Sequence, residues 1–261
     1  MNETPFNPNV ESPATQEASK QTSQGMRPVL IWDVPVRLVH WLMALSFTGA
    51  YLTSEADDWR WLHVSLGYTM MGLIVFRALW GFIGSRHARF TSFIKGPTEV
   101  FAYLKSLVSG RAQHYAGHNP AGAIAILALL ILGFIQTSTG HLLYQDLAGE
   151  WMEEVHEALA AVLLGVVLVH IAGVFISSHL HRENLIKAMF TGRKRADQKV
   201  AIHSHWRSIG LLVLLMVSAF WTYQLQDQLQ HQSKNTANDG KTATTESHAT
   251  TKQGKHEDDD D

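Results

Sequence analysis

Two histidines stand fourteen residues apart in one long apolar stretch, residues 153–178 (EEVHEALAAVLLGVVLVHIAGVFISS). His156 and His170 would lie about 21 Å apart along a helix that rises ~1.5 Å per residue. Fourteen residues make four turns at the ~3.5 residues per turn of a helical bundle, so both rings face roughly the same way. One ring then lies near each surface of a hydrocarbon layer ~30 Å thick. Because imidazole is a common axial ligand of haem iron, each ring is a candidate haem ligand.

Opposite ligands for these two histidines must come from other helices. Residues 36–53 (VRLVHWLMALSFTGAYLT) carry His40 near their start, and residues 60–83 carry His63 near theirs. Two more stretches, 120–142 and 206–224, are also long and apolar enough to cross a bilayer. The sequence therefore predicts an all-α integral membrane protein. We expect a four-helix transmembrane bundle that binds two haems, followed by a fifth, C-terminal transmembrane helix.

The charges of the connecting segments predict the orientation of the spans. Loops 53–59 and 143–155 contain acidic residues but neither lysine nor arginine. The segments after the second and fourth spans are basic; they contain Arg86, Arg89, Lys95, Lys105 and Arg111, and Arg182, Lys187, Arg193, Lys194, Arg195 and Lys199. By the positive-inside rule these basic segments are cytoplasmic. The N-terminus is then cytoplasmic, and five spans put the C-terminus on the outer side.

With this orientation the four histidines fall at two depths. His40 and His170 are level with each other near the cytoplasmic face, and His63 and His156 are level near the outer face. A six-coordinate haem iron takes two axial ligands from opposite sides, which facing helices of a bundle can supply. The depths therefore predict one haem between His40 and His170 and a second between His63 and His156.

Other interpretations of the histidines stay open. A single histidine at the end of a span is commonly an interfacial residue or a hydrogen-bonding partner between helices. Proton relay, metal transport, or a non-haem membrane anchor are alternatives of another class, although zinc or copper would usually require a tighter ligand cluster. His141, at the outer end of the third span, is a rival ligand to His63 or His156.

Two arginines are candidate partners of haem propionates, because a guanidinium group binds a carboxylate through two parallel hydrogen bonds. Arg37 precedes His40 by one turn, and Arg77 lies inside the second span. For Arg37 the alternative is that its side chain extends to the lipid headgroups.

Composition restricts the remaining functions. The absence of cysteine excludes disulfides, thiolate-ligated iron–sulfur clusters and covalently attached haem in this sequence. A net charge of −2 does not suggest a nucleic-acid partner. We divide the chain into a disordered N-terminal tail (1–27), a di-haem membrane domain (28–200), the fifth helix (201–225) and a disordered polar C-terminal tail (226–261). Apolar residues at helical spacing also predict surface-lying helices at 97–109 and 184–191.

Four motifs in residues 28–196 resemble the bacterial cytochrome b561 family, which is grouped with the b-type cytochrome subunits of nickel–iron hydrogenases. These motifs are WDVPVRLVHW (32–41), FRALWGFIGSRHARFTSFIKGP (76–97), GHNPAGA (117–123), and HREN (181–184) followed by TGRKR (191–195). The resemblance implies a four-helix bundle with two haem b groups in a bacterial inner membrane. The ligands that it implies are His40, His63, His156 and His170.

The resemblance also implies the kind of reaction. Members pass electrons between membrane quinones and a redox protein, either an iron–sulfur (hydrogenase-type) subunit or a c-type cytochrome, and some stand-alone members are superoxide:ubiquinone oxidoreductases. We therefore expect an electron-transfer protein or an oxidoreductase subunit. We expect its quinone site at the cytoplasmic side, around Arg77, Arg86 and the loop that contains His114 and His118. The fifth span and His141 depart from the family pattern.

Overall fold

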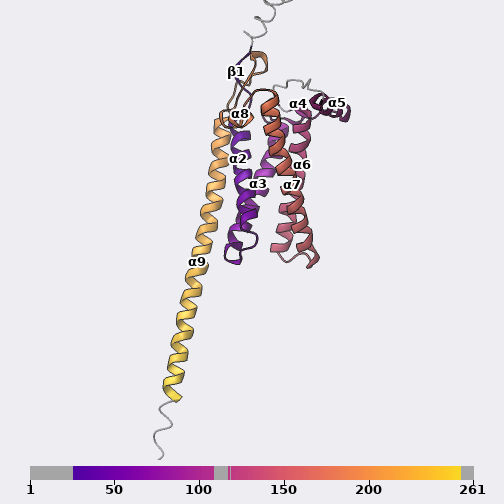
Figure 1. The fold of residues 1–261 in the computed structure, drawn as a ribbon. Helices are drawn as coiled ribbons and strands as arrows, with labels where there is room; N and C mark the ends of the chain where they lie inside the picture. Colours follow the sequence, from indigo (N-terminus) through magenta and orange to yellow (C-terminus); the bar gives the residue numbers. More distant parts are fainter. Residues whose placement is uncertain (1–25, 109–116, 118, 254–261) are drawn as a thin grey trace, which may run out of the picture. The chain divides into compact units, whose positions relative to one another are not determined.

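The computed structural model describes residues 26–108, 117 and 119–253. Four of its helices, α2 (Val34–Leu52), α3 (Arg60–Ile83), α6 (Pro120–Tyr144) and α7 (Trp151–Leu180), form a bundle (Figure 1). Helix α2 packs on α3, α3 on α6, and α6 on α7. The bounds of these helices differ from those of the first four predicted spans by at most two residues, which confirms these spans as helices.

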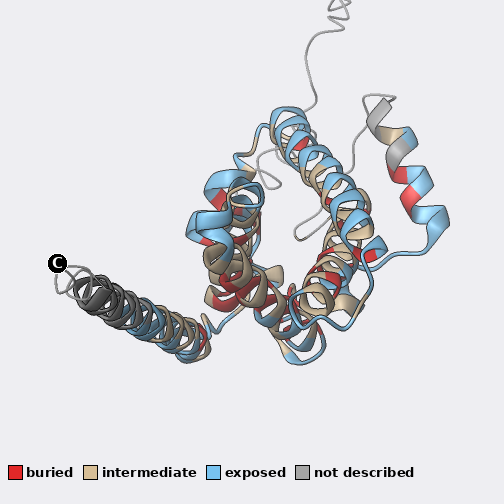
Figure 2. Ribbon diagram, turned by 90° about the horizontal axis from the view of Figure 1, so that it is seen from below, coloured by how far each residue is buried: buried red, intermediate tan, exposed pale blue. Residues whose placement is uncertain are grey.

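Helix length and composition indicate a membrane protein. Four segments are long and apolar enough to cross a membrane: Asp57–Ile83, Pro120–Tyr144, Trp151–Leu180 and Arg207–Lys234. Helix α2 is not among them, because Arg37, His40 and Trp41 in its first half reduce its hydropathy. Figure 2 shows exposed residues over much of the outer surface of the bundle, and large apolar side chains such as Phe82, Val169 and Phe175 are exposed there. Such a surface is suited to lipid.

Local sequence explains where two of the bundle helices begin. Asp33 is fully buried, and its carboxylate accepts a hydrogen bond from the backbone N–H of Val36 (2.8 Å) at the start of α2. Asn119 caps α6 in the same way by accepting a hydrogen bond from Gly122 N (2.7 Å). Pro35 and Pro120 occupy the first helical turn, where a proline loses no intrahelical hydrogen bond.

A small sheet closes one end of the bundle, and we did not predict it. Strand β1 (Met26–Leu30) pairs antiparallel with β2 (Arg193–Asp197), which follows α8 (Leu185–Thr191) and precedes the 3₁₀ turn η2 (Gln198–Val200). β1 begins inside the predicted tail 1–27, whose first 25 residues lie outside the described part of the chain. β2 reads RKRAD and lacks the apolar alternation typical of strands, so only its pairing partner reveals it.

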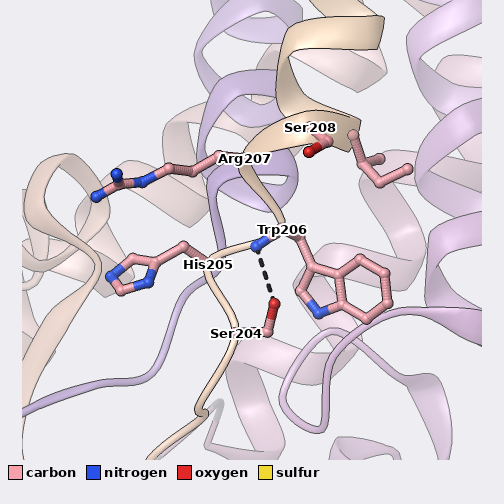
Figure 3. A pocket seen from close by; sticks show the side chains of 6 residues that line it. Ser204, His205, Trp206, Arg207 and Ser208 are labelled. Atoms are coloured by element: carbon pink, nitrogen blue, oxygen red, sulfur yellow. Dashed lines mark hydrogen bonds between the residues drawn. The ribbon is translucent and has the colours of Figure 1, made fainter.

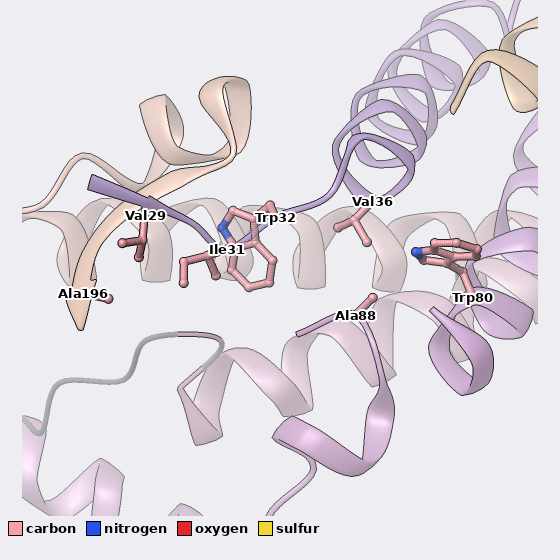
Figure 4. Packing of buried hydrophobic residues seen from close by; sticks show 7 residues of the cluster. All are labelled: Val29, Ile31, Trp32, Val36, Trp80, Ala88 and Ala196. Atoms are coloured by element: carbon pink, nitrogen blue, oxygen red, sulfur yellow. The ribbon is translucent and has the colours of Figure 1, made fainter. Parts of the chain in front are cut away.

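The sheet and the helix ends share one apolar cluster. Val29, Ile31, Trp32, Val36, Trp80, Ala88 and Ala196 are its buried members (Figure 4). Gly192, which has φ +79°, ends α8, and its carbonyl accepts hydrogen bonds from Ile31 N (2.8 Å) and Trp32 N (3.0 Å). A side chain at this position would approach the Trp32 carbonyl oxygen within 2.6 Å, so the junction requires glycine.

The short helices agree with the sequence patterns that predicted them. Helix α5 (Pro97–Val108) covers the predicted surface helix 97–109 as far as the described residues reach, and α8 matches the predicted helix 184–191. Helix α4 (Phe90–Phe93) and the 3₁₀ turn η1 (Asp57–Trp59) were not predicted.

Helix α9 (Arg207–Gln253) extends past residue 225, where we had ended the fifth span. The chain contains no proline after Pro120, so no residue there lacks the N–H that a helix requires. Residues from Leu214 onward form a separate unit by their internal contacts. The domain boundary at 226 stays a prediction, and residues 254–261 lie outside the described part of the chain.

Six consecutive residues before and within the start of α9, Ser204 to Ile209, line a shallow pocket (Figure 3). Trp206 has φ +51°, and its N–H donates to the Ser204 hydroxyl (3.3 Å). In Figure 3 the side chains of His205 and Arg207 point to one side and the Trp206 indole to the other. Since a single segment forms this pocket, it does not bring together groups from different helices, as a large cofactor would require.

Asp33 also accepts a hydrogen bond from Trp80 Nε1 (3.0 Å), which ties the start of α2 to α3. We predict that Asp33→Ala lowers the free energy of unfolding by about 2–4 kcal/mol, because it removes the cap and leaves the buried Trp80 N–H unpaired. Thermal unfolding in detergent measures this loss. Asp33→Asn keeps a capping oxygen and should lose less, so equal losses for the two variants would contradict the capping role.

Candidate functional site

The structure places the ring of His63 on α3 opposite the ring of His156 on α7. Their ring centroids are 6.3 Å apart, and their planes are inclined by 71°. Two imidazole nitrogens at about 2 Å from one metal, on opposite sides of it, would place the ring centroids roughly 6 Å apart. The observed spacing of the two rings therefore fits one iron atom between them.

The protonation of the His63 ring is determined by its neighbour. His63 Nδ1 lies 2.8 Å from the carbonyl oxygen of Ala50, in the last turn of α2. Because a carbonyl oxygen can only accept, Nδ1 carries the proton and donates it. The lone pair of the ring is then on Nε2, which is the nitrogen left for a metal.

A hydroxyl group holds His156 in the same tautomer. Thr139 Oγ1, on α6, donates to the carbonyl oxygen of Gln136 (2.8 Å) and therefore accepts from His156 Nδ1 (2.9 Å). The lone pair on His156 Nε2 accepts a hydrogen bond from the side-chain amide of Gln136 (3.0 Å). A metal bound at this nitrogen would take the place of the Gln136 amide.

His40 of α2 and His170 of α7 form a second pair at the other level of the bundle. Met43, three residues after His40, and Leu163, seven residues before His170, belong to one apolar cluster, so the two histidines lie on the same side of that cluster. His40 Nδ1 is buried, and among the described residues it has no hydrogen-bond partner. The ring edge of the neighbouring Trp41 packs against His40, with centroids 5.2 Å apart and planes inclined by 89°.

An apolar layer separates the two histidine levels. Leu163 is seven residues from both His156 and His170, and only 1% of its surface is exposed. It packs with Met70 and Ile74 of α3, and partly buried apolar residues of α2 and α6 surround this cluster. Each histidine pair is therefore a separate site, with side chains from all four helices between the two.

The helix contacts leave room beside the histidines. Among the described residues, α7 packs extensively on α6 but not to a comparable extent on α2 or α3, which carry the facing histidines. Gly67, one turn after His63, has no atom within 4 Å of the place a Cβ would occupy. Gly49 and Gly133 differ, since a Cβ there would approach side chains of α3 within 3 Å. Those two glycines serve helix packing.

The two predicted propionate partners have different surroundings. The Arg37 guanidinium donates to the backbone carbonyls of Asp33 (3.3 Å) and Phe190, so it joins α2 to α8. Arg77 is 5% exposed and lies over the Phe90 ring, 5.3 Å from the ring centroid. Arg77 Nη1 and Trp41 Nε1 are buried donors without a partner among the described residues. They are available to an anionic group, whereas Arg37 already has acceptors.

The competing histidines lie elsewhere. His141 accepts or donates a hydrogen bond with the Tyr68 hydroxyl (2.9 Å), and Tyr144 packs beside that tyrosine. The contact joins α6 to α3 and leaves His63 facing His156. His114 and His118, which we had assigned to the quinone region, lie outside the described residues.

Sequence reasoning missed the groups that hold the rings. Thr139 and Gln136 belong to a polar run, QTST (136–139), inside an otherwise apolar span, and this run was a usable signal. No sequence signal pointed to the Ala50 carbonyl or to Leu163. A backbone oxygen and one leucine among many show their role only after the helices are packed.

The donor set fits haem. Paired imidazoles from facing helices are ligands suited to a six-coordinate iron, and in the His63–His156 pair the protein also holds each Nδ1. The buried, unpaired donors of Arg77 and Trp41 suit a group that carries carboxylates.

Comparisons with known proteins agree with this arrangement. The family model described as prokaryotic cytochrome b561 matches residues 31–192. A probable Ni/Fe-hydrogenase B-type cytochrome subunit of Azotobacter chroococcum is 29% identical over 163 residues, which are 52% of this chain and 65% of the relative. A protein of the same description from Azotobacter vinelandii is 30% identical and covers 50% of this chain and 63% of its own length.

The matched region thus spans slightly less than two thirds of those two relatives. A similarly named subunit of Cupriavidus necator is 23% identical over 70% of this chain and 93% of its own length. No solved structure matches the chain. The family match extends over more than half of the sequence and includes all four histidines. The chain therefore belongs to the prokaryotic cytochrome b561 family.

Proposed function

We propose that this protein carries electrons across the membrane through two haem b groups, one at each histidine level. The observation that carries the proposal is the outer pair: the rings of His63 and His156 are 6.3 Å apart, and both Nδ1 atoms are engaged with the protein. His40 and His170 repeat the pairing at the other level. A haem held at each site would supply one-electron redox chemistry there.

The chain's own residues have separable tasks in this proposal. Ala50 and Thr139 orient the outer ligands. Arg77 and Trp41 offer donors to the propionates at the inner site, while Arg37 fastens α2 to α8. Leu163, Met70 and Ile74 exclude water from the middle of the bundle, so that electrons rather than solvated ions pass between the levels.

The haem count tests this proposal. A pyridine haemochrome assay of the purified protein should give two haem b per chain, and the dithionite-reduced spectrum should show both. His170→Ala should leave one haem, because one axial ligand of the inner site is lost while the outer site is intact. The matched control is His141→Ala, which should keep two haems because His141 pairs with Tyr68. One haem in the unchanged protein would refute the proposal.

The hydrogen bond that Thr139 accepts from His156 gives a second prediction. Thr139→Val keeps the shape but leaves His156 Nδ1 without its acceptor. Loss of such a ligand-orienting bond typically weakens metal binding by about 10–100-fold, so the outer haem should be lost more readily and shift its midpoint potential. Thr137→Val is the control, because Thr137 donates only within its own helix (2.9 Å to Gly133 O). A redox titration that showed unchanged potentials in both variants would contradict the role of Thr139.

The partners of the electron transfer belong to the same proposal. Because several relatives are named as Ni/Fe-hydrogenase cytochrome subunits, we propose a hydrogenase-type redox protein as one partner and a membrane quinone as the other. The quinone would exchange electrons near His40 and His170, at the end of the bundle that carries Arg77 and Arg86. The buried donors of Arg77 and Trp41 support a polar group at this level.

The His170→Ala variant also tests the place of the quinone. If quinone reacts at the inner level, a soluble ubiquinone analogue should oxidise the reduced variant at least tenfold more slowly than the unchanged protein, since the inner haem is missing. Stopped-flow absorbance at the haem bands follows this oxidation. An unchanged rate with the remaining outer haem would place quinone exchange at the outer level instead.

We propose a bacterial inner membrane location, with the N-terminus cytoplasmic and the C-terminus periplasmic. The elements that carry the basic segments, α4, α5, α8 and the strand pair, lie at one end of the bundle (Figure 1), which supports a single cytoplasmic face.

Because the chain contains no cysteine, single introduced thiols report the orientation without background. A membrane-impermeant maleimide added to intact spheroplasts should label Glu55→Cys in the 53–59 loop but not Lys187→Cys in α8. Labelling of Lys187→Cys alone would reverse the proposed orientation. Labelling of both variants after lysis is the control for reactivity.

A further inference from the structure

A basic pocket lies at the end of α3, apart from both histidine levels. It has a volume of about 360 Å³, and among its lining residues are Arg86, His87, Arg89, Ser92, Lys95 and Gly117. They come from the turn after α3, from α4 and its flanks, and from the residues before α6. Three of them, Arg86, Arg89 and Lys95, are basic, and no acidic side chain is among the described residues that line the pocket.

The backbone that carries these cations is firmly held. Ala88 and Phe93 are 1% and 3% exposed, so they anchor the turn and α4 in the protein interior. The Arg86 guanidinium donates to the Lys199 carbonyl (3.4 Å), and His87 Nε2 donates to the Val200 carbonyl (2.7 Å). These two contacts fasten the turn to η2, so the pocket has a fixed wall.

The charge of the pocket comes from Arg86, Arg89 and Lys95. Burial lowers the pKa of His87, against the hydrogen bond to Val200, which raises it, so this ring contributes shape more than charge. Lys95 is partly balanced by Glu99 (3.7 Å), and both of these side chains are exposed. Arg86 and Arg89 thus line the pocket without a carboxylate partner among the described residues.

Exposed apolar residues adjoin the pocket residues in the sequence. Phe82 and Ile83, in the last turn of α3, are 70% and 74% exposed, and Ile94 is 46% exposed. Large apolar side chains next to cations at the end of a membrane-spanning helix are placed where acyl chains meet headgroups. A neutral quinone ring would gain little from three cations, whereas a phosphate oxyanion would bind to several of them at once.

We propose that this pocket binds a phosphate group, supplied by the headgroup of an anionic phospholipid. Basic pockets between membrane helices bind such headgroups, and arginine suits them because its guanidinium fork matches two phosphate oxygens. Inorganic phosphate shares this chemistry. The flanking Phe82, Ile83 and Ile94 favour the lipid, because a free anion makes no use of them.

Native mass spectrometry of the full, haem-loaded chain tests the proposal. The protein is delipidated in detergent and titrated with phosphatidylglycerol, with phosphatidylcholine, or with inorganic phosphate. We expect phosphatidylglycerol to bind, and Arg86→Gln with Arg89→Gln to weaken its binding by roughly tenfold or more. The matched control is Lys187→Gln with Arg195→Gln, which removes two exposed cations of the same bundle end outside the pocket and should bind like the unchanged protein.

The remaining outcomes separate the sources of the phosphate. Inorganic phosphate that competes with phosphatidylglycerol at similar concentration would show that the site recognises the oxyanion without the acyl chains. Equal losses in the pocket variant and the control variant, or equal binding of phosphatidylglycerol and phosphatidylcholine, would overturn the proposal. The haem spectrum monitors folding in each variant. If the glutamine variant loses haem, Arg86→Lys with Arg89→Lys keeps the charge and should retain part of the binding.

Discussion

An imidazole can offer one nitrogen to a metal in a reproducible direction only when the protein holds the other nitrogen. At the level of His63 and His156 two hydrogen bonds meet this condition, and they run between helices: His63 of α3 donates to Ala50 of α2, and His156 of α7 donates to Thr139 of α6. Each bond joins one pair of neighbouring helices. The orientation of these two rings thus depends on the packing of α2 on α3 and of α6 on α7. A change in the packing of either helix pair would therefore alter the orientation of a histidine ring.

The two ends of the bundle are built differently. The end near His63 and His156 contains these ring-orienting hydrogen bonds and short connections such as η1 between α2 and α3. The other end is closed by the β1–β2 pair, α8 and an apolar cluster around Trp32 and Trp80. Beneath this closure lie the buried donors of Trp41 and Arg77. A buried donor without a partner costs free energy, so this end is organised to receive polar groups rather than to exclude them.

Between the two levels the protein is apolar and tightly packed. Because Gly133 has no side chain, Ile74 and Met70 of α3 pack closely against the backbone of α6. Leu163 of α7 packs against the same two side chains. This layer fixes the distance between the levels, since α7 cannot slide along its neighbours without opening a cavity around Leu163. The packing around Leu163 therefore holds His156 and His170 of α7 at fixed depths relative to the neighbouring helices.

The sequence by itself determined the helices of the bundle, the two histidine levels and the family. Apolar length, the Asp33–Pro35 and Asn119–Pro120 starts and the position of each histidine along its span are local properties, and local properties can be read from one segment at a time. Only the tertiary structure decided which groups hold the rings and that RKRAD forms a strand. It also decided that Arg37 binds carbonyl groups, while Arg77 Nη1 has no partner in the part of the chain that the structure describes. These features depend on contacts between residues far apart in the chain, such as Arg37 with Phe190 and β1 with β2. A hydrogen bond between two helices has no signature in the sequence of either helix alone, because the donor on one helix meets its acceptor only after the two helices have packed together.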